Sequence, residues 1–595
     1  MHTLIDDAPE AVTTAGLAPA PFEPLLDGVR IAVVAPDASW QLGEPHDGVR
    51  MLTVRCPGAP LEIRLSVPLG DAAGYWHPQG GWQRTLLADW AGRSEVSLVD
   101  AAAAGCLYDH TGATLLTFAA ADPVREASLR FGVSEESDTH VVHLRLPASK
   151  EPHEIAFVPR AASVASALRV LRGWFAERIV PMPVPEAART PVYSTWYAFN
   201  QNVSATEVET QATLAARLGC GVLILDDGWQ ELGSGRGYAG CGDWRPDRAK
   251  FPDFTAHVER VQETGLRYVA WIAPLLLGPS AACFDRLASC APAPAGAPGA
   301  YVLDPRLPQV RAHVVELCTR LVAEHGLDGL KVDFLDEVMV YAGSPECPAG
   351  ADIPDVGLAM TALLTELRAA LESVRPEVLL ELRQPYTGPG MAPFGNMLRS
   401  FDCPADATAN RVRTLDTSLL AVGGAVHSDM LLWDRDAPVE AVARQLIGAL
   451  HCVPQISVRL DELSESHLRT VEFWLRQWSA HRELLLDGEV EPGRPDELFT
   501  VVRAAAAGQA LISVHSDRVV PLDLAAHQRF TLVNGSPTDR IAVEVRGGEG
   551  WTQSLVHGPD GRMIEGPLHF LHEGLQSLPV PRGGLISLTV SEGPR

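Results

Sequence analysis

The chain is short of positive charge. Its 48 Lys and Arg residues stand against 74 Asp and Glu residues, which gives a formal net charge of −26. A protein that binds nucleic acid needs a basic surface to neutralise the phosphates, so the composition excludes nucleic acid as an expected partner. An acidic surface does not repel a neutral ligand such as a sugar, and by itself it serves solubility.

Long hydrophobic runs are absent as well. No apolar stretch approaches the ~20 residues that a membrane-spanning helix needs. The first twenty residues, MHTLIDDAPEAVTTAGLAPA, include acidic residues and lack both the basic segment and the continuous apolar segment of a secretory signal. We therefore expect no membrane association and a cytoplasmic location.

Motifs for disulfides, metals and cofactors are missing. The ten cysteines are scattered with no CxxC pair, which indicates separate reduced thiols rather than a disulfide framework or a zinc site. No Gly-rich phosphate loop follows a strand-like run, and neither HExxH nor GxSxG occurs. We expect neither a metal ion nor a cofactor.

The chain is long enough for several domains, since 595 residues exceed one ordinary core. Short alternating apolar runs between residues 22 and 159, such as LEIRLSVPL (61–69), predict an antiparallel β-sandwich. The Pro-rich stretch PMPVPEAARTP (181–191) marks a boundary. Alternating runs return after residue 487 and predict a second, smaller sandwich. The expected domains are 1–180, 181–487 and 488–595.

The middle domain alternates strand-like runs with amphipathic, helix-like segments, the pattern of βα units. Eight units in a region of this size predict a TIM barrel, (β/α)8, flanked by the two sandwiches. Little room for a helix remains between the fifth and sixth strands. The eight expected strands are 191–199, 221–227, 267–274, 329–334, 377–383, 396–402, 424–431 and 454–460.

Polar residues follow these strands. The stretch GVLILDDGWQ (221–230) and the stretch LDGLKVDFLDE (327–337) both run from apolar residues into carboxylates. Reactive groups of a TIM barrel collect at the C-terminal ends of its strands. We expect the rim to hold Trp196, Asp226, Asp227, Lys331, Asp333, Glu381, Arg383, Asp402, His427 and Asp429.

A rim rich in carboxylates, without a cofactor motif, favours glycoside hydrolysis. One carboxylate attacks the anomeric carbon and the other protonates the leaving oxygen. Lys331 shares a strand face with Asp333, and a nearby cation keeps a carboxylate ionised. Simpler interpretations stay open: Asp226 or Asp227 caps a turn, or Asp333 is only an ion-pair partner of Lys331. The pair His427 and Asp429 lacks a third ligand for a metal site.

Two stretches together carry a family resemblance. LILDDGWQ (223–230) and LKVDFLDE (330–337) resemble glycoside hydrolase family 36, the α-galactosidase, melibiase and raffinose-synthase type of enzyme. The resemblance extends to TWYAF (195–199), to GDWRPDRAKFPDF (242–254) and to the order sandwich, barrel, sandwich. It implies a retaining α-glycosidase, foremost an α-galactosidase, that works by double displacement.

The resemblance also assigns roles. Asp333 falls on the nucleophile, and Asp402, within LRSFDCPADA, falls on the acid/base; Asp406 is the alternative. His427 and Asp429 have no motif match, but their place on the seventh strand would point them at the pocket. Sugar binding is implied for Trp196, Asp226, Asp227, Trp229, Lys331 and Arg383.

Two stretches depart from the family pattern. ELRQPYTGPGMAPFGN (381–396) replaces a Cys- and Gly-rich loop, and WIAPLLLG (271–278) lacks a Glu after the tryptophan. The sugar therefore stays open between an α-galactoside, an α-N-acetylgalactosaminide and a β-L-arabinopyranoside. A transglycosylase and a non-catalytic carbohydrate-binding protein are the remaining alternatives. The expected partner is an oligosaccharide substrate, and assembly into a homo-oligomer is left open.

Overall fold

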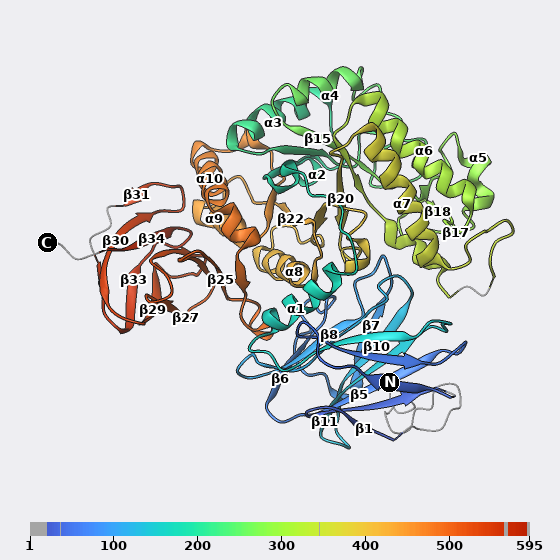
Figure 1. Ribbon diagram of the computed structural model, residues 1–595. Helices are drawn as coiled ribbons and strands as arrows, with labels where there is room; N and C mark the ends of the chain where they lie inside the picture. Colours follow the sequence, from blue (N-terminus) through green and yellow to red (C-terminus); the bar gives the residue numbers. More distant parts are fainter. Residues whose placement is uncertain (1–20, 36, 344–345, 565–568, 592–595) are drawn as a thin grey trace.

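The structure is a computed structural model that describes residues 21–35, 37–343, 346–564 and 569–591. Two β-sandwiches flank a closed barrel (Figure 1), as the sequence predicts. The expectation about the first twenty residues lies outside this described part. Among the described helices, none combines the length and the apolar composition that a bilayer crossing requires.

The N-terminal sandwich has two six-stranded sheets, ordered β1-β2-β5-β11-β10-β7 and β3-β4-β12-β9-β8-β6. Inward-facing residues such as Ile63, Leu107 and Phe118 fill the space between them. The strands are β1 Glu23–Leu26, β2 Val29–Val34, β3 Ser39–Leu42, β4 Arg50–Arg55, β5 Leu61–Pro68, β6 Ala72–Trp76, β7 Gly92–Val96, β8 Ala104–Asp109, β9 Thr114–Ala120, β10 Ala127–Ser134, β11 Thr139–Leu146 and β12 His153–Val158.

The barrel closes through eight parallel strands in sequence order, so all eight predicted strands are confirmed. Leu and Val are their most frequent residues, and every strand residue except Arg267 and Arg383 is buried, as expected for a barrel wall. The strands are β13 Val192–Ser194, β14 Val222–Leu225, β15 Arg267–Ile272, β19 Gly329–Val332, β20 Leu379–Arg383, β21 Met397–Arg399, β22 Ala425–Leu431 and β23 Val453–Ile456.

Helices with clear start and stop signals surround the barrel. Ser204 caps α3 by accepting a hydrogen bond from Glu207 N, and Gly219 ends that helix at φ +99°. Between β20 and β21 lies only the short 3-10 turn η6, Pro389–Met391, in line with the limited room there. The principal helices are α3 Ala205–Leu218, α4 Phe254–Gln262, α6 Pro308–His325, α7 Val356–Val374, α8 Ala407–Leu420, α9 Val439–Gly448 and α10 Glu465–Asp487.

The first barrel strand is shorter than predicted. It was expected over 191–199 but ends at Ser194, and Trp196–Phe199 forms the short helix α2. Phe199 N donates to Thr195 O at 2.9 Å, so the chain turns as soon as it reaches the rim. The aromatic residues of TWYAF favour a strand by composition, but the rim offers no neighbouring strand to pair with.

Helix α1, Val164–Ala176, lies between the N-terminal sandwich and the barrel (Figure 1). Its Leu168 and Leu171 share an apolar cluster with Leu415 and Leu419 of α8.

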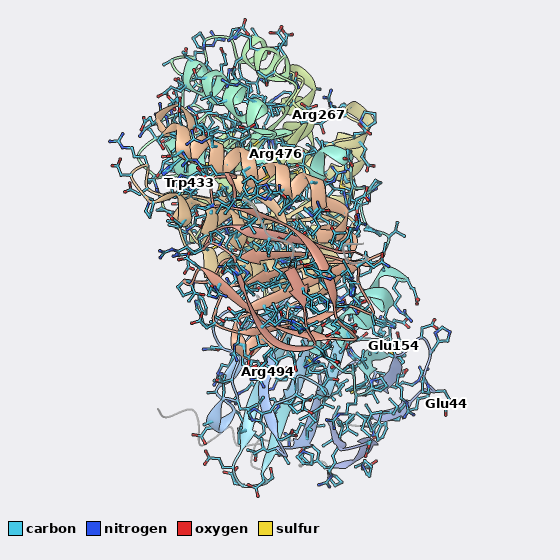
Figure 2. All side chains as sticks on the ribbon, turned by 90° about the vertical axis from the view of Figure 1, so that its left-hand side faces the viewer. Glu44, Glu154, Arg267, Trp433, Arg476 and Arg494 are labelled. Atoms are coloured by element: carbon cyan, nitrogen blue, oxygen red, sulfur yellow. The ribbon has the colours of Figure 1, made fainter. Side chains whose placement is uncertain are left out.

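A C-terminal sandwich follows α10 directly, because β24 begins at Glu489. Figure 2 views the molecule from this side, where Arg494 lies at the border with the N-terminal sandwich and donates to His110 O. The strands of the C-terminal sandwich are β24 Glu489–Glu491, β25 Val501–Ala506, β26 Gln509–Val514, β27 Val519–Asp523, β28 Arg529–Asn534, β29 Arg540–Arg546, β30 Gly550–His557, β31 Met563–Ile564, β32 His569–Leu571, β33 Gly574–Pro579 and β34 Leu585–Ser591.

Candidate active site

Asp333 stands at the C-terminal end of β19 and accepts hydrogen bonds on both oxygens. Trp271 Nε1 donates to Oδ2 at 2.8 Å. Arg383 Nε, Phe334 N and Tyr386 OH donate to Oδ1 at 2.5, 2.7 and 3.3 Å. Asp333 is buried, with 8% of the residue exposed, so these four donors define the position of its carboxylate.

The charge state of Asp333 follows from this environment. Burial would by itself raise the pKa of this carboxyl group, but Arg383 and Lys331 together with the Trp271 hydrogen bond hold the pKa well below its usual range. Asp333 is therefore an ionised carboxylate at any pH near neutrality, the state that a nucleophile needs.

Phe334, the next residue, has a left-handed backbone with φ +56°. This conformation is rare for a bulky side chain and costs about 1–3 kcal/mol. It turns the Phe334 N–H back onto Asp333, and the phenyl ring lies 5.5 Å from the Arg383 guanidinium. Local strain thus helps to hold both the carboxylate and its cation.

Lys331 connects two neighbouring strand ends. Its ammonium donates to Asp226 Oδ2 at 2.6 Å and lies 4.0 Å from Glu381. The backbone N–H of Asp226 donates to Thr195 Oγ1 at 2.9 Å, which helps to position Asp226. Lys331 acts on Asp333 through space, while its direct bond goes to Asp226.

Asp227 is held by two amide side chains. Gln201 Nε2 and Gln230 Nε2 each donate to it at 2.7 Å. Burial raises the pKa of Asp227 to about 6, and repulsion from Asp226 acts in the same direction. The hydrogen bonds from Gln230 and Gln201 lower the pKa but offset the effect of burial only in part. This carboxylate changes charge in a pH range that an enzyme can experience.

Asp402 follows β21 and is the more open of the two expected catalytic residues, with a side chain 53% exposed. Arg399 Nη1 donates to it at 2.9 Å and to Asp429 at 2.6 Å. Desolvation by the surrounding protein would by itself raise the pKa of Asp402, but Arg399, Arg383 and Lys331 outweigh it and lower the pKa. Since Arg383 and Lys331 also act on Asp333, the two carboxylates share one set of cations.

Asp429 is fully buried and occupied by protein groups. Besides Arg399, its carboxylate accepts from Tyr197 OH at 3.0 Å and from Cys403 N at 2.6 Å. It therefore positions the chain around Asp402. Trp196, on α2, is half-buried, and its ring is 5.0 Å from the Arg236 guanidinium.

Two expected sugar-binding residues lie elsewhere. Trp229 is 0% exposed, and its indole N–H donates to Trp271 O at 2.9 Å, so it supports Trp271 from behind. His427 is also 0% exposed, and its ring contacts Ala188 O at 2.9 Å, ahead of β13 at the opposite end of the barrel. A bulge between residues 427 and 430 of β22 separates it from Asp429.

The alternative acid/base, Asp406, caps a helix. Its Oδ1 accepts from Thr408 N at 3.0 Å and Ala409 N at 2.9 Å at the start of α8. An N-cap of this kind explains an Asp at this position without catalysis.

Sequence reasoning missed several side chains that hold the site. Trp271 is the penultimate residue of the third strand and Gln230 ends the stretch LILDDGWQ, so both carried a positional signal. Of the other three, two come from loops: Gln201 donates to Asp227 and Tyr386 to Asp333. The third, Arg399, donates to Asp402 from β21. For Gln201 and Tyr386 nothing in the local pattern marked them, because only the folded loops aim them inward.

Comparison with family models and curated proteins places this chain among known proteins. A family model described as Melibiase matches residues 166–390. An α-galactosidase of Escherichia coli is 30% identical over 176 residues, which cover 28% of this chain and 24% of that protein. Alpha-galactosidase 2 of Pediococcus pentosaceus is 28% identical over 173 residues, with the same two shares. The chain thus spans about a quarter of the length of the curated relatives it matches.

Solved structures resemble the chain over much more of its length. The GH36 α-galactosidase AgaA of Geobacillus stearothermophilus covers 98% of this chain and 88% of its own, with a TM-score of 0.63 and 16% identity. The galactosidase domain of the α-galactosidase-sucrose kinase AgaSK covers 98% and 84%, with a TM-score of 0.63 and 14% identity. These findings confirm the resemblance that the motifs indicated: residues 166–390 match the melibiase family model, and the chain shares its overall fold with the solved GH36 α-galactosidases.

Proposed function

We propose that this protein is a retaining α-galactosidase that removes terminal α-linked galactose from oligosaccharides. The observation that carries the proposal is Asp333, a buried carboxylate held ionised by four donors at the C-terminal end of a barrel strand. Asp402 lies within the field of the same cations and remains accessible from solvent. This pairing of a fixed nucleophile with an open acid/base suits double displacement.

In the first step, an Asp333 oxygen forms a bond to the anomeric carbon while the bond from that carbon to the leaving oxygen breaks. Asp402 gives its proton to the leaving oxygen, and a glycosyl ester of Asp333 results. In the second step, water attacks the same carbon, Asp402 takes the proton of the water, and Asp333 is released.

Asp402 must be protonated before the first step, although Arg399 favours its ionised form in the free protein. Arg399 does not lose its partner when Asp402 takes up a proton, because the same nitrogen is bonded to Asp429. A substrate that displaces Asp402 from Arg399 would restore the protonated acid, so we place this exchange at substrate binding.

The proposed substrate is supported by the relatives. Structures of AgaA variants are described in complex with stachyose and with raffinose, and an α-galactosidase of Thermus thermophilus in complex with p-nitrophenyl α-D-galactopyranoside. In this chain Asp226 and Asp227 would accept hydrogen bonds from sugar hydroxyls, and Trp196 would offer an apolar ring face.

A panel of 4-nitrophenyl glycosides tests the proposal: the α-galactoside, the α-N-acetylgalactosaminide, the α-glucoside and the β-L-arabinopyranoside, each with wild type and Asp333→Ala. Release from the α-galactoside that the substitution abolishes is the expected result. Preferential release from another glycoside would move the sugar specificity and keep the mechanism. A folded wild-type protein that binds galactose and releases nothing would favour the carbohydrate-binding alternative.

Two further measurements test whether the anomeric configuration is retained and whether water or a sugar hydroxyl accepts the galactosyl group. Proton NMR of the first sugar released from the α-galactoside should show the α-anomer; early β-anomer would contradict a retaining mechanism. Transfer products in the presence of excess raffinose, at the expense of free galactose, would identify a transglycosylase.

The proposal includes a cytoplasmic location. All ten cysteines lie within the described residues, and none of them is in a disulfide, which suits a reducing compartment. Fractionation of the native host tests the location. Light scattering of the purified protein tests whether it forms the homo-oligomer that the resemblance leaves open.

A further inference from the structure

A cavity of about 620 Å³ lies at the end of the barrel opposite Asp333. Its walls come from α1, from the end of α8, from the first residues of β22 and from the segment that joins α10 to β24. All three domains therefore contribute to it. Its volume falls within the range of about 300–1,000 Å³ that is typical of small-molecule sites.

Arg172 of α1 lines this cavity and has no counter-charge among the residues that the structure describes. Its Nη1 donates to Ser418 O at 3.1 Å, and among the described residues no carboxylate pairs with it. Burial and then the neighbouring Arg169 lower the pKa of Arg172, as expected for a cation without an acidic partner. A partly buried guanidinium with free donors is an unusual cost unless an anion offsets it.

The other arginines on the wall are already paired. Arg169 bonds Glu491 at 3.0 Å, and Arg189 bonds Asp487. These pairs use the acidic groups at the rim of the cavity, so they leave the charge of Arg172 uncompensated. Because acidic residues outnumber basic ones in this chain, 74 to 48, a cation without an acidic partner is unusual here and points to a ligand that supplies the negative charge.

His451 supplies a second unpaired polar group. It lines the same cavity and is 7% exposed. Its Nε2 lies 3.0 Å from Ser513 Oγ, but its Nδ1 has no hydrogen-bond partner. Burial lowers the pKa of His451 to about 3, so the ring is neutral and Nδ1 can take part in a neutral hydrogen bond.

The remaining walls are apolar. Leu415, Leu419, Val422, Val426 and Leu485 all line the cavity and are buried. A ligand that fits would combine an oxyanion for the guanidinium with a compact non-polar body. A bare inorganic ion would leave these walls wet.

We propose that this cavity is a binding site for a small organic anion, whose carboxylate or phosphonate-type oxygens bond to Arg172 and whose non-polar body contacts the leucine and valine walls. A guanidinium presents two parallel donors that match such an oxyanion. The site is separate from the proposed catalytic rim. Because three domains line it, occupancy should stabilise their junction.

Isothermal titration with simple aromatic probes tests the proposal: benzoate and phenylphosphonate as anions and benzamide as the neutral analogue of benzoate, all at one ionic strength. We expect the wild type to bind at least one anion and to bind benzamide at least about tenfold more weakly. Arg172→Met should weaken anion binding by a similar factor. Arg217→Met, the same change at an exposed position of α3, is the matched control and should bind like the wild type.

Thermal unfolding of each variant without ligand keeps the test independent of folding. Arg172→Met removes an unpaired cation and should unfold near the wild-type temperature. Binding of benzoate alone identifies a carboxylate ligand, and binding of phenylphosphonate alone identifies a phosphate-like ligand. No binding of either anion to the folded wild type, equal binding of benzamide, or unchanged anion binding by folded Arg172→Met would each overturn the proposal.

Discussion

At the scale of single residues, Asp333 concentrates the chemistry. Four donors converge on it, and one of them depends on the strained backbone of Phe334. A carboxylate with so many donors is costly to replace, because every donor then loses its acceptor.

Asp333→Ala should lower kcat on the 4-nitrophenyl α-galactoside by about three orders of magnitude or more, since the covalent intermediate cannot form. Added azide should restore part of the turnover by taking the place of the carboxylate. Asp285→Asn, at an exposed position of the short helix α5, Phe284–Leu287, is the control and should be as active as the wild type. Wild-type activity in Asp333→Ala would show that the nucleophile lies elsewhere.

Asp402 should matter in proportion to how poor the leaving group is. Asp402→Ala is expected to lose at least about a hundredfold in kcat/KM on raffinose, whose leaving oxygen needs a proton, and far less on the nitrophenyl substrate. Comparison of the two substrates with one enzyme preparation checks this. Equal losses on both would argue against a proton-donor role.

Asp227 should impose an acidic limb on the pH profile. Its pKa is raised to about 6, so it is neutral below that pH and ionised above it. If the ionised form binds the sugar, kcat/KM on the nitrophenyl galactoside should fall about tenfold per pH unit below pH ~6. In Asp227→Asn the value should be lower throughout and the limb near pH 6 should disappear; a limb that persists would assign the titration to another group.

At the scale of secondary-structure elements, the first turn of α8 separates two neighbouring aspartates by role. Asp402 lies three residues after the end of β21 and accepts a hydrogen bond from Arg399, whereas Asp406 is the N-cap of α8. Asp406→Ala should therefore reduce stability by about 1 kcal/mol through loss of the cap and leave kcat/KM on raffinose nearly unchanged. Urea unfolding and kinetics on the same sample check both halves, and a large loss of activity would reinstate Asp406 as the acid/base.

At the scale of the whole molecule, a buried ion pair joins the N-terminal sandwich to the barrel. Asp416 of α8 accepts from both terminal nitrogens of Arg84 and from Trp76 Nε1 at 2.8 Å. Arg84 and Asp416 are 2% and 3% exposed. The contact is therefore part of the shared interior of two domains.

Asp416→Ala should destabilise the protein by about 3–5 kcal/mol, because Arg84 remains buried without its partner. The expected observation is a lower midpoint of denaturation monitored by tryptophan fluorescence. Glu366→Ala, at an exposed position of α7, is the matched control and should change the midpoint little. A midpoint for Asp416→Ala within the error of the control would mean that the two domains are held by apolar packing alone.

The sequence by itself determined the order of the domains and the eight barrel strands, because periods of two and of 3.6 residues and buried apolar runs are local properties. It also determined that carboxylates directly follow two of the strands, Asp226 after β14 and Asp333 after β19. The end of β13 and the course of Trp196–Phe199 were wrong in the prediction, since pairing at a barrel rim depends on neighbours that composition does not reveal.

Only the tertiary structure decided which side chains meet. His427 and Asp429 are two positions apart in one strand, yet a bulge sends one to Ala188 and the other to Arg399. Trp229 shares a motif with Asp227 but packs behind the site, and Tyr386 enters it from a loop without a motif. Hydrogen bonds and electrostatic fields act between residues far apart in the chain, so their partners are settled only when the strands close into the barrel.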